Sequence, residues 1–326
     1  MYNNSTTFTR LEISTPELDA AELDWWKKFS EIEEHFCWVQ TPAIQQFLRG
    51  DYLRHIVGLV PPNGRILELG CGTGWLVIIL AKLKANRVVG VDFSDKQIEQ
   101  ARRRAVEAKV TDRVSFRVAD VFSMRGSSEV FDVIIVHGLL HHLTMIEIRR
   151  ALATAHKLLG KNGRMVIWEP VHYPLLELPP KAQRLLRFLR WLQNIPVRGQ
   201  RWKLRRFSAE ERRVRELIAE REVVTPPFGP SPKEMPFSPG ELPTLIAPYF
   251  HIKERRRCLA VSHLIAQETL LMEVSHPFLA RLVRWPLLIA ARQIERRLLA
   301  LDPPPSGMWI VEMFDCVPIH STHNPD

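Results

Sequence analysis

Residues 65–74 read R-I-L-E-L-G-C-G-T-G, and the rest of the chain is organised around this stretch. The mostly apolar run 66–69 predicts a short buried strand, the glycines at 70, 72 and 74 predict a tight turn, and 75–83 predicts a helix directly after it. Glycine is needed there because the backbone turns sharply and a ligand must approach it closely. A strand that ends in a glycine turn and opens a helix is typical of a nucleotide-binding βα unit.

The spacing of the glycines distinguishes this turn from a dinucleotide fingerprint. In G-x-G-x-x-G the helix N-terminus carries a pyrophosphate, but here the third glycine, Gly74, comes one residue early and Trp75 follows it. The acidic Glu68 stands two residues before the first glycine. The spacing therefore argues against a dinucleotide site, and the rest of the chain must identify the ligand.

Strands and helices alternate downstream of the turn, which is typical of a parallel sheet. Strands are predicted at 66–69, 88–92, 114–118, 131–136 and 165–168, and helices at 75–83, 96–109 and 146–159. Beyond Pro170 we expect helices at 183–191 and 209–221, irregular structure over 225–248, strands at 250–255, 258–262 and 309–314, and a helix over 277–301 interrupted near Pro286. The predicted fold class is α/β, a Rossmann-like parallel sheet with an antiparallel C-terminal strand and helices on both faces.

Carboxylates stand at the ends of two predicted strands, where ligands bind in an open α/β sheet. Asp92 closes the second strand, 18 residues after Gly74, and can accept hydrogen bonds from both hydroxyls of a ribose. Asp120 closes the third strand and can accept one from an exocyclic amine such as adenine N6. An aspartate in either place also suits the N-cap of the next helix, but the order and distance of both relative to the glycine turn favour a ligand site.

Five segments of the chain together resemble the class I S-adenosylmethionine (SAM) methyltransferases, in the broad ubiquinone/menaquinone-methyltransferase-like group (methyltransferase type 11). They occur in family order and cover about a third of the chain: I-L-E-L-G-C-G-T-G (66–74), V-V-G-V-D (88–92), A-D-V-F (119–122), F-D-V-I-I-V-H-G-L-L-H-H-L (131–143) and L-L-G-K-N-G-R-M-V-I-W-E-P (158–170). The resemblance implies SAM as the cofactor and methyl transfer as the reaction.

The resemblance also implies which residues contact SAM. The aminoacyl part lies along Glu68 and the turn Gly70, Cys71, Gly72 and Gly74. The ribose, the adenine and the methionine end are then assigned to residues at the ends of the next three strands: Asp92 on the ribose, Phe93 on an adenine face, Asp120 and Val121 beside the adenine, and His137 near the methionine end.

The chain is expected to have four parts around this cofactor. Residues 1–60 form an N-terminal helical lid, 61–170 the SAM-binding core, 171–245 a helical and proline-rich substrate insertion, and 246–326 the C-terminal strands and helix that complete the core. In the first part, Trp25 or Trp26 either covers the cofactor, which would exclude water during the reaction, or takes part in plain helix packing.

Histidines near the strand ends are candidates for removing a proton from the methyl acceptor, since the pKa of histidine is close to neutrality. His172, just beyond the fifth strand, is the leading candidate for the general base. His141 and His142 are further candidates that also suit a structural role, and Glu169 is an alternative that also suits a shaped turn. No metal site is expected, because the histidines lack an i, i+4 pair with a nearby carboxylate.

The net charge of +9 is concentrated, because positions 181–221 hold 13 basic and 4 acidic residues. Apolar and aromatic helices edged with arginine are either interfacial helices on an anionic membrane or ordinary amphipathic helices packed on a core. We therefore expect a hydrophobic small-molecule acceptor such as a lipid, quinone-like compound or secondary metabolite, with a membrane surface as a further partner. The alternatives are an RNA methyltransferase that binds through 181–221 and a SAM-binding protein without turnover.

The four cysteines, Cys37, Cys71, Cys258 and Cys316, lack C-x-x-C spacing, which argues against a zinc site or a disulfide scaffold and fits a reducing compartment. The N-terminus has no apolar run typical of a signal peptide. The sequence also has no uncharged apolar stretch long enough to predict a transmembrane helix. We expect a cytoplasmic protein, with membrane association through its basic helices as an alternative. The sequence carries no signal for an oligomeric state.

Overall fold

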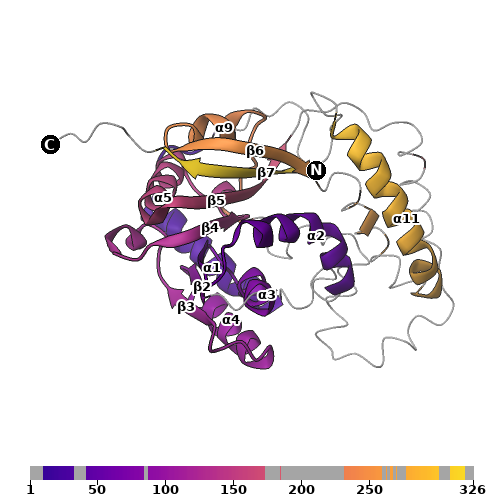
Figure 1. The fold of residues 1–326 in the computed structure, drawn as a ribbon, viewed down its shortest axis with the longest axis horizontal. Helices are drawn as coiled ribbons and strands as arrows, with labels where there is room; N and C mark the ends of the chain where they lie inside the picture. Colours follow the sequence, from indigo (N-terminus) through magenta and orange to yellow (C-terminus); the bar gives the residue numbers. More distant parts are fainter. Residues whose placement is uncertain are drawn as a thin grey trace.

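The computed structural model describes residues 10–32, 42–83, 87–172, 184, 231–258, 262, 265–266, 269, 277–300 and 309–319. Its centre is a seven-stranded sheet in the order β3-β2-β1-β4-β5-β7-β6 (Figure 1). The strands are β1 (Arg65–Leu69), β2 (Arg87–Asp92), β3 (Val114–Val118), β4 (Phe131–His137), β5 (Leu159–His172), β6 (Phe250–Cys258) and β7 (Trp309–Pro318). Neighbouring strands from β3 to β5 are parallel, and β7 runs antiparallel to both β5 and β6. The predicted fold class is confirmed.

The helices cover both faces of the sheet and also its carboxyl edge. They are α1 (Pro16–Ile32), α2 (Pro42–Leu59), α3 (Trp75–Leu83), α4 (Asp95–Glu107), α5 (Met145–Leu158), α9 (Glu241–Ile246) and α11 (Pro277–Leu298), with 3₁₀ turns η2 (Ser123–Gly126) and η3 (Leu140–His142). Ser94 is the N-cap of α4, and its side chain accepts a hydrogen bond from the Gln97 amide.

Two hydrophobic clusters lie on the two faces of the sheet. Along β1, Leu67 and Leu69 belong to one cluster with residues of α5 and α9, whereas Ile66 belongs to the other with residues of α2, α3 and α4. Successive side chains of a strand point to opposite faces, so a strand buried on both sides must be apolar nearly throughout. This is why the central strands could be recognised as continuous apolar runs.

The strand order reverses between β1 and β4, because the chain runs outward from β1 to β3 and then returns to the other side of β1. In an open α/β sheet, this reversal leaves a crevice at the carboxyl ends of the two central strands. The glycine turn follows β1, and η3 closely follows β4. The fold therefore brings the predicted cofactor turn and the histidines of η3, His141 and His142, to the same carboxyl edge of the sheet.

Four of the predicted elements differ from the structure. A strand is predicted over 258–262, but β6 ends at Cys258 and Ser262 is helical. The sequence predicts irregular structure over 225–248, but Glu241–Ile246 forms α9, because Pro243 falls in the first helical turn, where its missing N–H costs nothing. The helix α11 continues through Pro286, which is exposed, so that water can hydrate the carbonyl left without a donor. The fifth strand begins at Leu159, earlier than predicted, because Leu159 pairs with Phe131.

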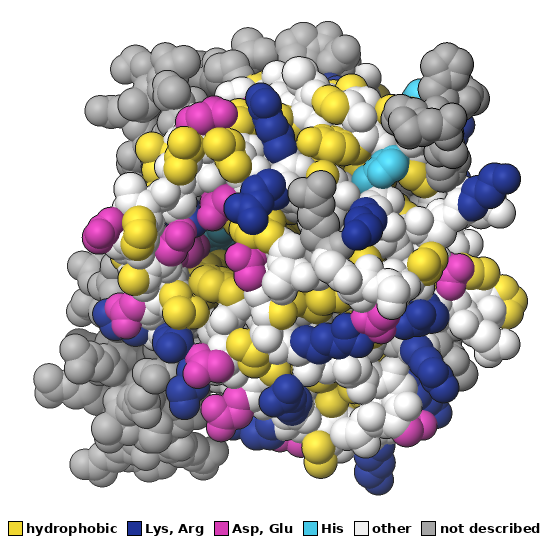
Figure 2. All heavy atoms as spheres, turned by 90° about the vertical axis from the view of Figure 1, so that its left-hand side faces the viewer, with side chains coloured by type: hydrophobic (Ala, Val, Ile, Leu, Met, Phe, Trp, Pro, Cys, Tyr) yellow, Lys and Arg dark blue, Asp and Glu magenta, His cyan; other side chains and the backbone are white. Residues whose placement is uncertain are grey.

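The described surface carries mixed charges. Figure 2 shows lysine and arginine side chains interspersed with acidic and hydrophobic ones over one face of the molecule. The predicted helices 183–191 and 209–221, the basic stretch 181–221 and most of the insertion 171–245 lie outside the described residues. None of the described helices combines the length and the hydropathy needed to cross a membrane.

Gly74→Ala is expected to lower the free energy of unfolding by about 2 kcal/mol, since overpacking a core and a positive φ both destabilise. Gly74 has φ +75°, and a Cβ there would lie 2.8 Å from the ring of Phe116 and 2.9 Å from Cβ of Ala101. Urea unfolding followed by circular dichroism measures the change. Gly58→Ala is the control, because Gly58 lies within α2 with nothing within 4 Å of its Cβ position; this variant should gain about 0.5 kcal/mol. Equal stabilities would contradict the packing role of Gly74.

Candidate active site

Backbone hydrogen bonds hold the glycine turn against the end of β2. The first two amides of the turn donate to the Val91 carbonyl at 2.8 and 2.9 Å. The Gly72 amide donates to Oδ2 of Asp92 at 2.9 Å, and the Ser94 amide donates to Oδ1 at the same distance. Burial raises the pKa of the Asp92 carboxyl to about 6, although the Ser94 and Gly72 amides oppose this effect. The predicted cofactor turn and the predicted ribose ligand thus form one connected unit.

Gly72 differs from the other two glycines of the turn because it faces open space. A Cβ at Gly70 would lie 2.8 Å from Leu139, so Gly70 allows the segment after β4 to pack on the turn. At Gly72, with φ +50°, the one atom of the described residues within 4 Å of a Cβ would be Oε1 of Gln97, at 3.6 Å. The backbone of Gly72 is therefore the part of the turn that a ligand can approach.

Glu68 lies below the turn with a carboxylate oxygen that needs a donor. The residue is 2 % exposed, and its Oε2 has no hydrogen-bond partner among the described residues. Burial raises the pKa of the Glu68 carboxyl well above its ordinary value, and the nearby Asp92 carboxylate adds to the effect. A buried acceptor of this kind fits the ammonium group of the aminoacyl part of SAM, because a cationic donor would satisfy it and favour its charged form.

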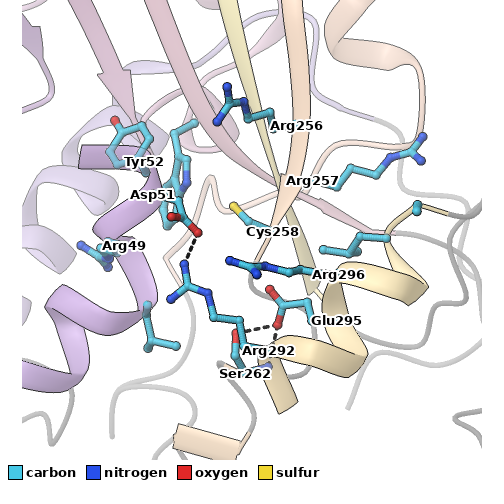
Figure 3. A pocket seen from close by; sticks show the side chains of 14 residues that line it. Arg49, Asp51, Tyr52, Arg256, Arg257, Cys258, Ser262, Arg292, Glu295 and Arg296 are labelled. Carbon is cyan, nitrogen blue, oxygen red and sulfur yellow. Dashed lines mark hydrogen bonds and ion pairs between the residues drawn. The ribbon is translucent and has the colours of Figure 1, made fainter. Parts of the chain in front are cut away.

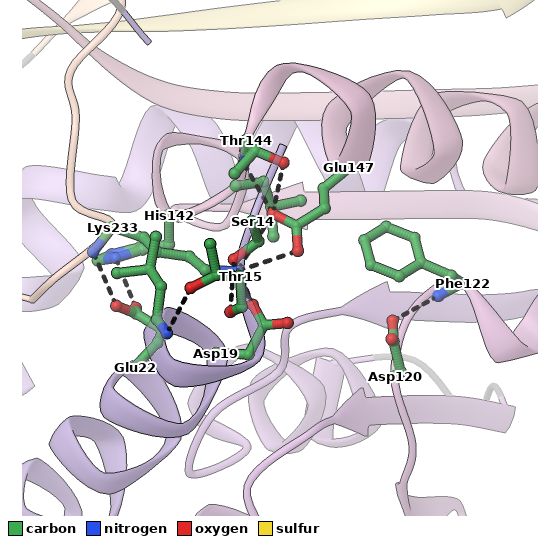
Figure 4. Close-up of polar contacts among 12 residues, drawn as sticks. Ser14, Thr15, Asp19, Glu22, Asp120, Phe122, His142, Thr144, Glu147 and Lys233 are labelled. Atoms are coloured by element: carbon green, nitrogen blue, oxygen red, sulfur yellow. Dashed lines mark hydrogen bonds and ion pairs between the residues drawn. The ribbon is translucent and has the colours of Figure 1, made fainter. Parts of the chain in front are cut away.

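The adenine side of the predicted site lies at the ends of β2 and β3. Asp120 is exposed, and Figure 4 shows its carboxylate accepting a hydrogen bond from the Phe122 amide, at 2.8 Å. Partial burial raises the pKa of the Asp120 carboxyl. Val121 is buried beside it, and the ring of Phe93 is 39 % exposed at the end of β2. These three side chains offer an acceptor and two apolar surfaces at the carboxyl edge, as an adenine site requires.

His137 lies in a group of aromatic rings. Its ring centroid is 4.3 Å from that of Trp168, 5.4 Å from Tyr52 and 6.0 Å from Trp75. The guanidinium of Arg49 lies 4.6 Å from the ring centroid of Trp75. Burial, with Arg49 nearby, lowers the pKa of His137 well below its ordinary value, so the imidazole is neutral at physiological pH. The group surrounds the end of β4, where the methionine end of SAM is predicted.

Three residues of this group, two aromatic ones and an arginine, could not be recognised from the sequence. Tyr52 and Arg49 come from α2, which has no motif, and Trp168 lies within an apolar run typical of a buried strand. The register of β4 and β5 pairs His137 with Trp168, which places their rings at the same edge. Only this strand register indicates that the rings of His137 and Trp168 meet.

The structure joins two of the predicted catalytic residues, His141 and Glu169. The Nδ1 of His141 lies 2.7 Å from Oε2 of Glu169. The other carboxylate oxygen of Glu169 accepts hydrogen bonds from the amides of Leu139 and Leu140, at 2.9 and 2.7 Å. Glu169 therefore holds the η3 turn and the imidazole in place together.

Burial dominates the electrostatics of this pair. It raises the pKa of Glu169 to about 7, against the opposing effect of the Leu140 and Leu139 amides. It lowers the pKa of His141 to about 3, and the Arg10 guanidinium lowers it further. Both pKa shifts favour the neutral form of the side chain, so the pair as a whole takes up or releases one proton near neutral pH. Such a histidine–carboxylate pair can accept a proton from a bound hydroxyl.

His142 belongs to a second, separate histidine–carboxylate pair. Its Nδ1 lies 3.3 Å from Oε1 of Glu22 on α1 and 3.1 Å from the hydroxyl oxygen of Ser231. The Ser231 hydroxyl donates to Glu22, and the Lys233 amide donates to the same carboxylate at 2.9 Å. Figure 4 shows Glu22, His142 and Lys233 together at one end of α1. Burial alone would raise the pKa of Glu22, but the hydrogen bonds and charge of this network leave it lowered.

The pair His142–Glu22 gives α1 a fixed place over the edge of the sheet. Nε1 of Trp26 donates to Glu22 at 2.8 Å, and the Trp26 ring lies edge-on to the ring of His142, with centroids 5.1 Å apart. Trp25 instead stacks on Phe29 within α1. The role of Glu22 was missed from the sequence, because nothing in the pattern of α1 distinguishes it from the other acidic residues of that helix.

His172 lies apart from both pairs. It pairs with Trp309 in the register of β5 and β7, and its backbone amide donates to the Phe237 carbonyl at 2.8 Å. His172 is three residues beyond Glu169 on the same strand, so the two side chains leave the sheet on opposite faces. The leading base candidate of the sequence is therefore not part of the pair that Glu169 forms.

One group of potential metal ligands occurs in the described part of the chain. Nitrogen and oxygen atoms of His55, Glu254 and Asp315 lie within 4.8 Å of one another. The Asp315 carboxylate already pairs with both nitrogens of the Arg164 fork, and Glu254 pairs with Arg256. Because guanidinium groups already neutralise these carboxylates, the group is explained as a network of ion pairs.

Comparison with known proteins finds methyltransferases. A family model described as a methyltransferase domain matches residues 66–163. The 27-O-demethylrifamycin SV methyltransferase of Amycolatopsis mediterranei is 33 % identical over 141 residues, which are 43 % of this chain and 51 % of that protein. A ubiquinone biosynthesis O-methyltransferase of Bartonella tribocorum is 26 % identical over 49 % of this chain and 65 % of that protein. The chain thus spans about half the length of the curated relatives it matches.

Solved structures are similar at a lower level. A SAM-dependent methyltransferase from Geobacter sulfurreducens, in complex with S-adenosyl-L-homocysteine, is 18 % identical, covering 86 % of this chain and 99 % of that one, with a TM-score of 0.43. Because this TM-score is low, the fold is assigned from the strand order described above.

A reversed α/β sheet with a glycine turn after its first strand, whose sequence matches a methyltransferase domain over residues 66–163, defines a class I SAM-dependent methyltransferase domain. The domain falls in the same broad group as the ubiquinone and demethylmenaquinone methyltransferases.

Proposed function

We propose that this protein transfers the methyl group of SAM to a hydroxyl group of a hydrophobic small molecule, with His141 as the general base. The observation that carries the proposal is the buried His141–Glu169 pair beside the ends of β4 and β5. Two of the relatives are named for O-methylation, one of a rifamycin and one in ubiquinone biosynthesis. A hydroxyl acceptor must lose a proton during transfer, which gives the pair its role.

When bound, SAM supplies an electrophilic methyl group on a sulfonium, and the protein aligns the acceptor with it. Glu169, anchored by the two η3 amides, accepts the proton of His141 Nδ1 and so leaves the lone pair on Nε2. Among the described residues, Nε2 of His141 makes no hydrogen bond. That nitrogen is the one that takes the acceptor proton in our proposal, and the fixed carboxylate stabilises the imidazolium that forms.

Turnover of SAM in the presence of small-molecule extracts tests the proposal. Purified full-length protein is incubated with SAM labelled in the methyl group, and the products are separated into organic-soluble, aqueous and macromolecular fractions. We expect label in a small molecule. Label in RNA would favour the alternative acceptor instead. SAM binding without any labelled product would indicate a SAM-binding protein without turnover.

The rate of methyl transfer should fall as the pH drops below about 7, because burial holds the pKa of Glu169 near that value. Below it, the protonated Glu169 carboxyl donates to Nδ1, so the single imidazole proton of His141 moves to Nε2 and the base is blocked. Above it, Nε2 is free to accept. A pH profile of kcat/KM measures this as an acid limb. In Glu169→Gln the limb near pH 7 should vanish; a limb that persists unchanged would contradict the assignment.

As a finer part of the proposal, the enzyme acts at an anionic membrane surface, and α11 supports this. Its exposed apolar residues recur at spacings of four, three and four and so form one stripe along the helix: Phe278, Leu282, Trp285 and Ile289. Arg281 and Arg297 are exposed on either side of the line of this stripe, since each residue turns the helix by about 100°. An apolar stripe between arginines suits a helix that lies in a membrane interface.

Flotation with vesicles containing phosphatidylserine at low salt tests the membrane part. We expect the protein to float, and Phe278→Ser combined with Leu282→Ser to reduce the bound fraction severalfold, since apolar area is lost from the stripe. Ile294→Ser is the matched control, because Ile294 is equally apolar and 49 % exposed but lies on the opposite side of α11. Equal losses in both proteins, or no flotation of the wild type, would remove the membrane from the proposal.

A further inference from the structure

A cavity of about 350 Å³ lies between α2, β6 and α11. Five arginines line it: Arg49, Arg256, Arg257, Arg292 and Arg296 (Figure 3). Two carboxylates, Asp51 and Glu295, lie among them. The volume falls in the range of small-molecule sites, which span about 300–1,000 Å³. It exceeds what a single small anion needs.

Among the described residues around the cavity, arginines are more numerous than carboxylates. Arg292 pairs with Asp51, Arg257 with Glu312 behind it, and Arg256 with Glu254 at the rim. The carboxylate of Glu295 accepts hydrogen bonds from the amide and hydroxyl of Ser262, at 2.7 and 2.5 Å. Even when Glu254 and Glu312 are counted with the two lining carboxylates, the arginines outnumber them.

Two walls of the cavity are shared with the methyl-transfer region. Tyr52 and Trp168 line the cavity, and their rings also contact the ring of His137 at the end of β4. The guanidinium of Arg49 lies 5.3 Å from the ring centroid of Trp168. A molecule in the cavity would therefore have its other end beside the predicted methionine end of SAM, on the face of β5 that carries Trp168 and His172 and opposite to Glu169.

Tyr52 carries a buried polar atom that has no partner in the described part of the chain. Tyr52 is 4 % exposed, and its hydroxyl makes no hydrogen bond among the described residues. Burial raises the pKa of this hydroxyl well above its ordinary value, so it remains a donor. A buried donor without an acceptor is costly, but in Figure 3 this hydroxyl points away from the arginines, so it does not contribute to the anion site.

We propose that this cavity holds an anionic group of the methyl acceptor, so that the acceptor is an acid with an apolar body. Guanidinium forks match carboxylate and phosphate oxygens in bidentate geometry, and both groups fit the same cluster. The aromatic wall of Tyr52 and Trp168 suits the apolar body next to the charged end. The inference rests on the proposed function for the identity of the ligand, but the anion site itself can be tested without turnover.

Calorimetric titration of the full-length protein with inorganic pyrophosphate and with benzoate tests the anion site, against sodium chloride at equal ionic strength. Binding of pyrophosphate alone would assign a phosphate group, and binding of benzoate alone a carboxylate. Arg296→Gln should weaken the bound probe about tenfold, as expected for one charge-assisted hydrogen bond. Arg297→Gln is the matched control, because Arg297 is the next residue, is exposed and does not line the cavity. No binding beyond chloride, or equal loss in both variants, would overturn the site.

The acceptor class is tested separately on the labelled products of the extract experiment. The extract is divided on an anion-exchange resin at neutral pH before incubation, and we expect the acceptor in the retained, acidic fraction. An acceptor found only in the flow-through would overturn the inference while the methyltransferase assignment stands. Pyrophosphate or benzoate binding that depends on Arg296, with no methylated product in any fraction, would uphold the anion site and refute the proposed function.

Discussion

Replacing His141 with alanine is expected to lower kcat about 10²- to 10⁴-fold, the range that loss of a general base produces. The variant removes the imidazole that Glu169 holds, at 2.7 Å, and leaves the glycine turn and Asp92 intact. SAM affinity should therefore stay unchanged while the transfer step slows. Single-turnover rates with the acceptor found in extract, together with calorimetric SAM binding, separate the two effects.

His172→Ala is the informative comparison, because the sequence makes His172 the leading base and the structure places it away from Glu169. We expect it to lose less activity than His141→Ala. A larger loss of activity in His172→Ala than in His141→Ala would indicate that His172 is the general base. A similar small loss in both variants would indicate that alignment of donor and acceptor, without a base, carries the reaction.

Replacing Asp92 with alanine is expected to weaken SAM binding about a hundredfold, or about 3 kcal/mol, since the charged acceptor of two ribose hydroxyls is lost. Asp92 is 7 % exposed, and the Gly72 and Ser94 amides orient both of its oxygens. Calorimetric titration with SAM or S-adenosyl-L-homocysteine measures the change.

Two controls keep the Asp92 prediction specific. Asp95→Ala removes an exposed carboxylate three residues away at the start of α4, and it should leave SAM affinity unchanged. Asp92→Asn keeps one acceptor oxygen and the side-chain shape, so it should fall between wild type and alanine. Unchanged SAM affinity in a folded Asp92→Ala protein would overturn the ribose role.

The cofactor half of the site was readable from the sequence because it is local. Glu68, the turn and Asp92 occur within 25 residues, and each belongs to a strand end or turn whose position follows from apolar runs and glycine spacing. Parallel strands bring their carboxyl ends to one edge, so the order of the motifs already implied their proximity. The structure adds the bond that connects Gly72 to Asp92.

The acceptor half was only partly readable, because its residues come from distant segments. His141, His142 and Glu169 were candidates on the sequence, but the partner of each histidine was not, and Glu22 lies 120 residues away from His142 on α1. The arginine cavity joins Arg49 on α2 with Arg257 on β6 and Arg292 on α11. No period or spacing links these positions, since only packing of the helices against the sheet edge brings them together.

By itself, then, the sequence determined the α/β class, the strand-and-helix order, and the positions of the glycine turn and of the carboxylates that are predicted to bind SAM, because local periodicity and glycine conformation control these features. Only the tertiary structure decided that Glu169 pairs with His141 and that Glu22 pairs with His142. It alone placed His172 on the other face of β5 from Glu169 and gathered five arginines beside Trp168. Those outcomes depend on strand register and on long-range burial of charge, which no local pattern of residues encodes.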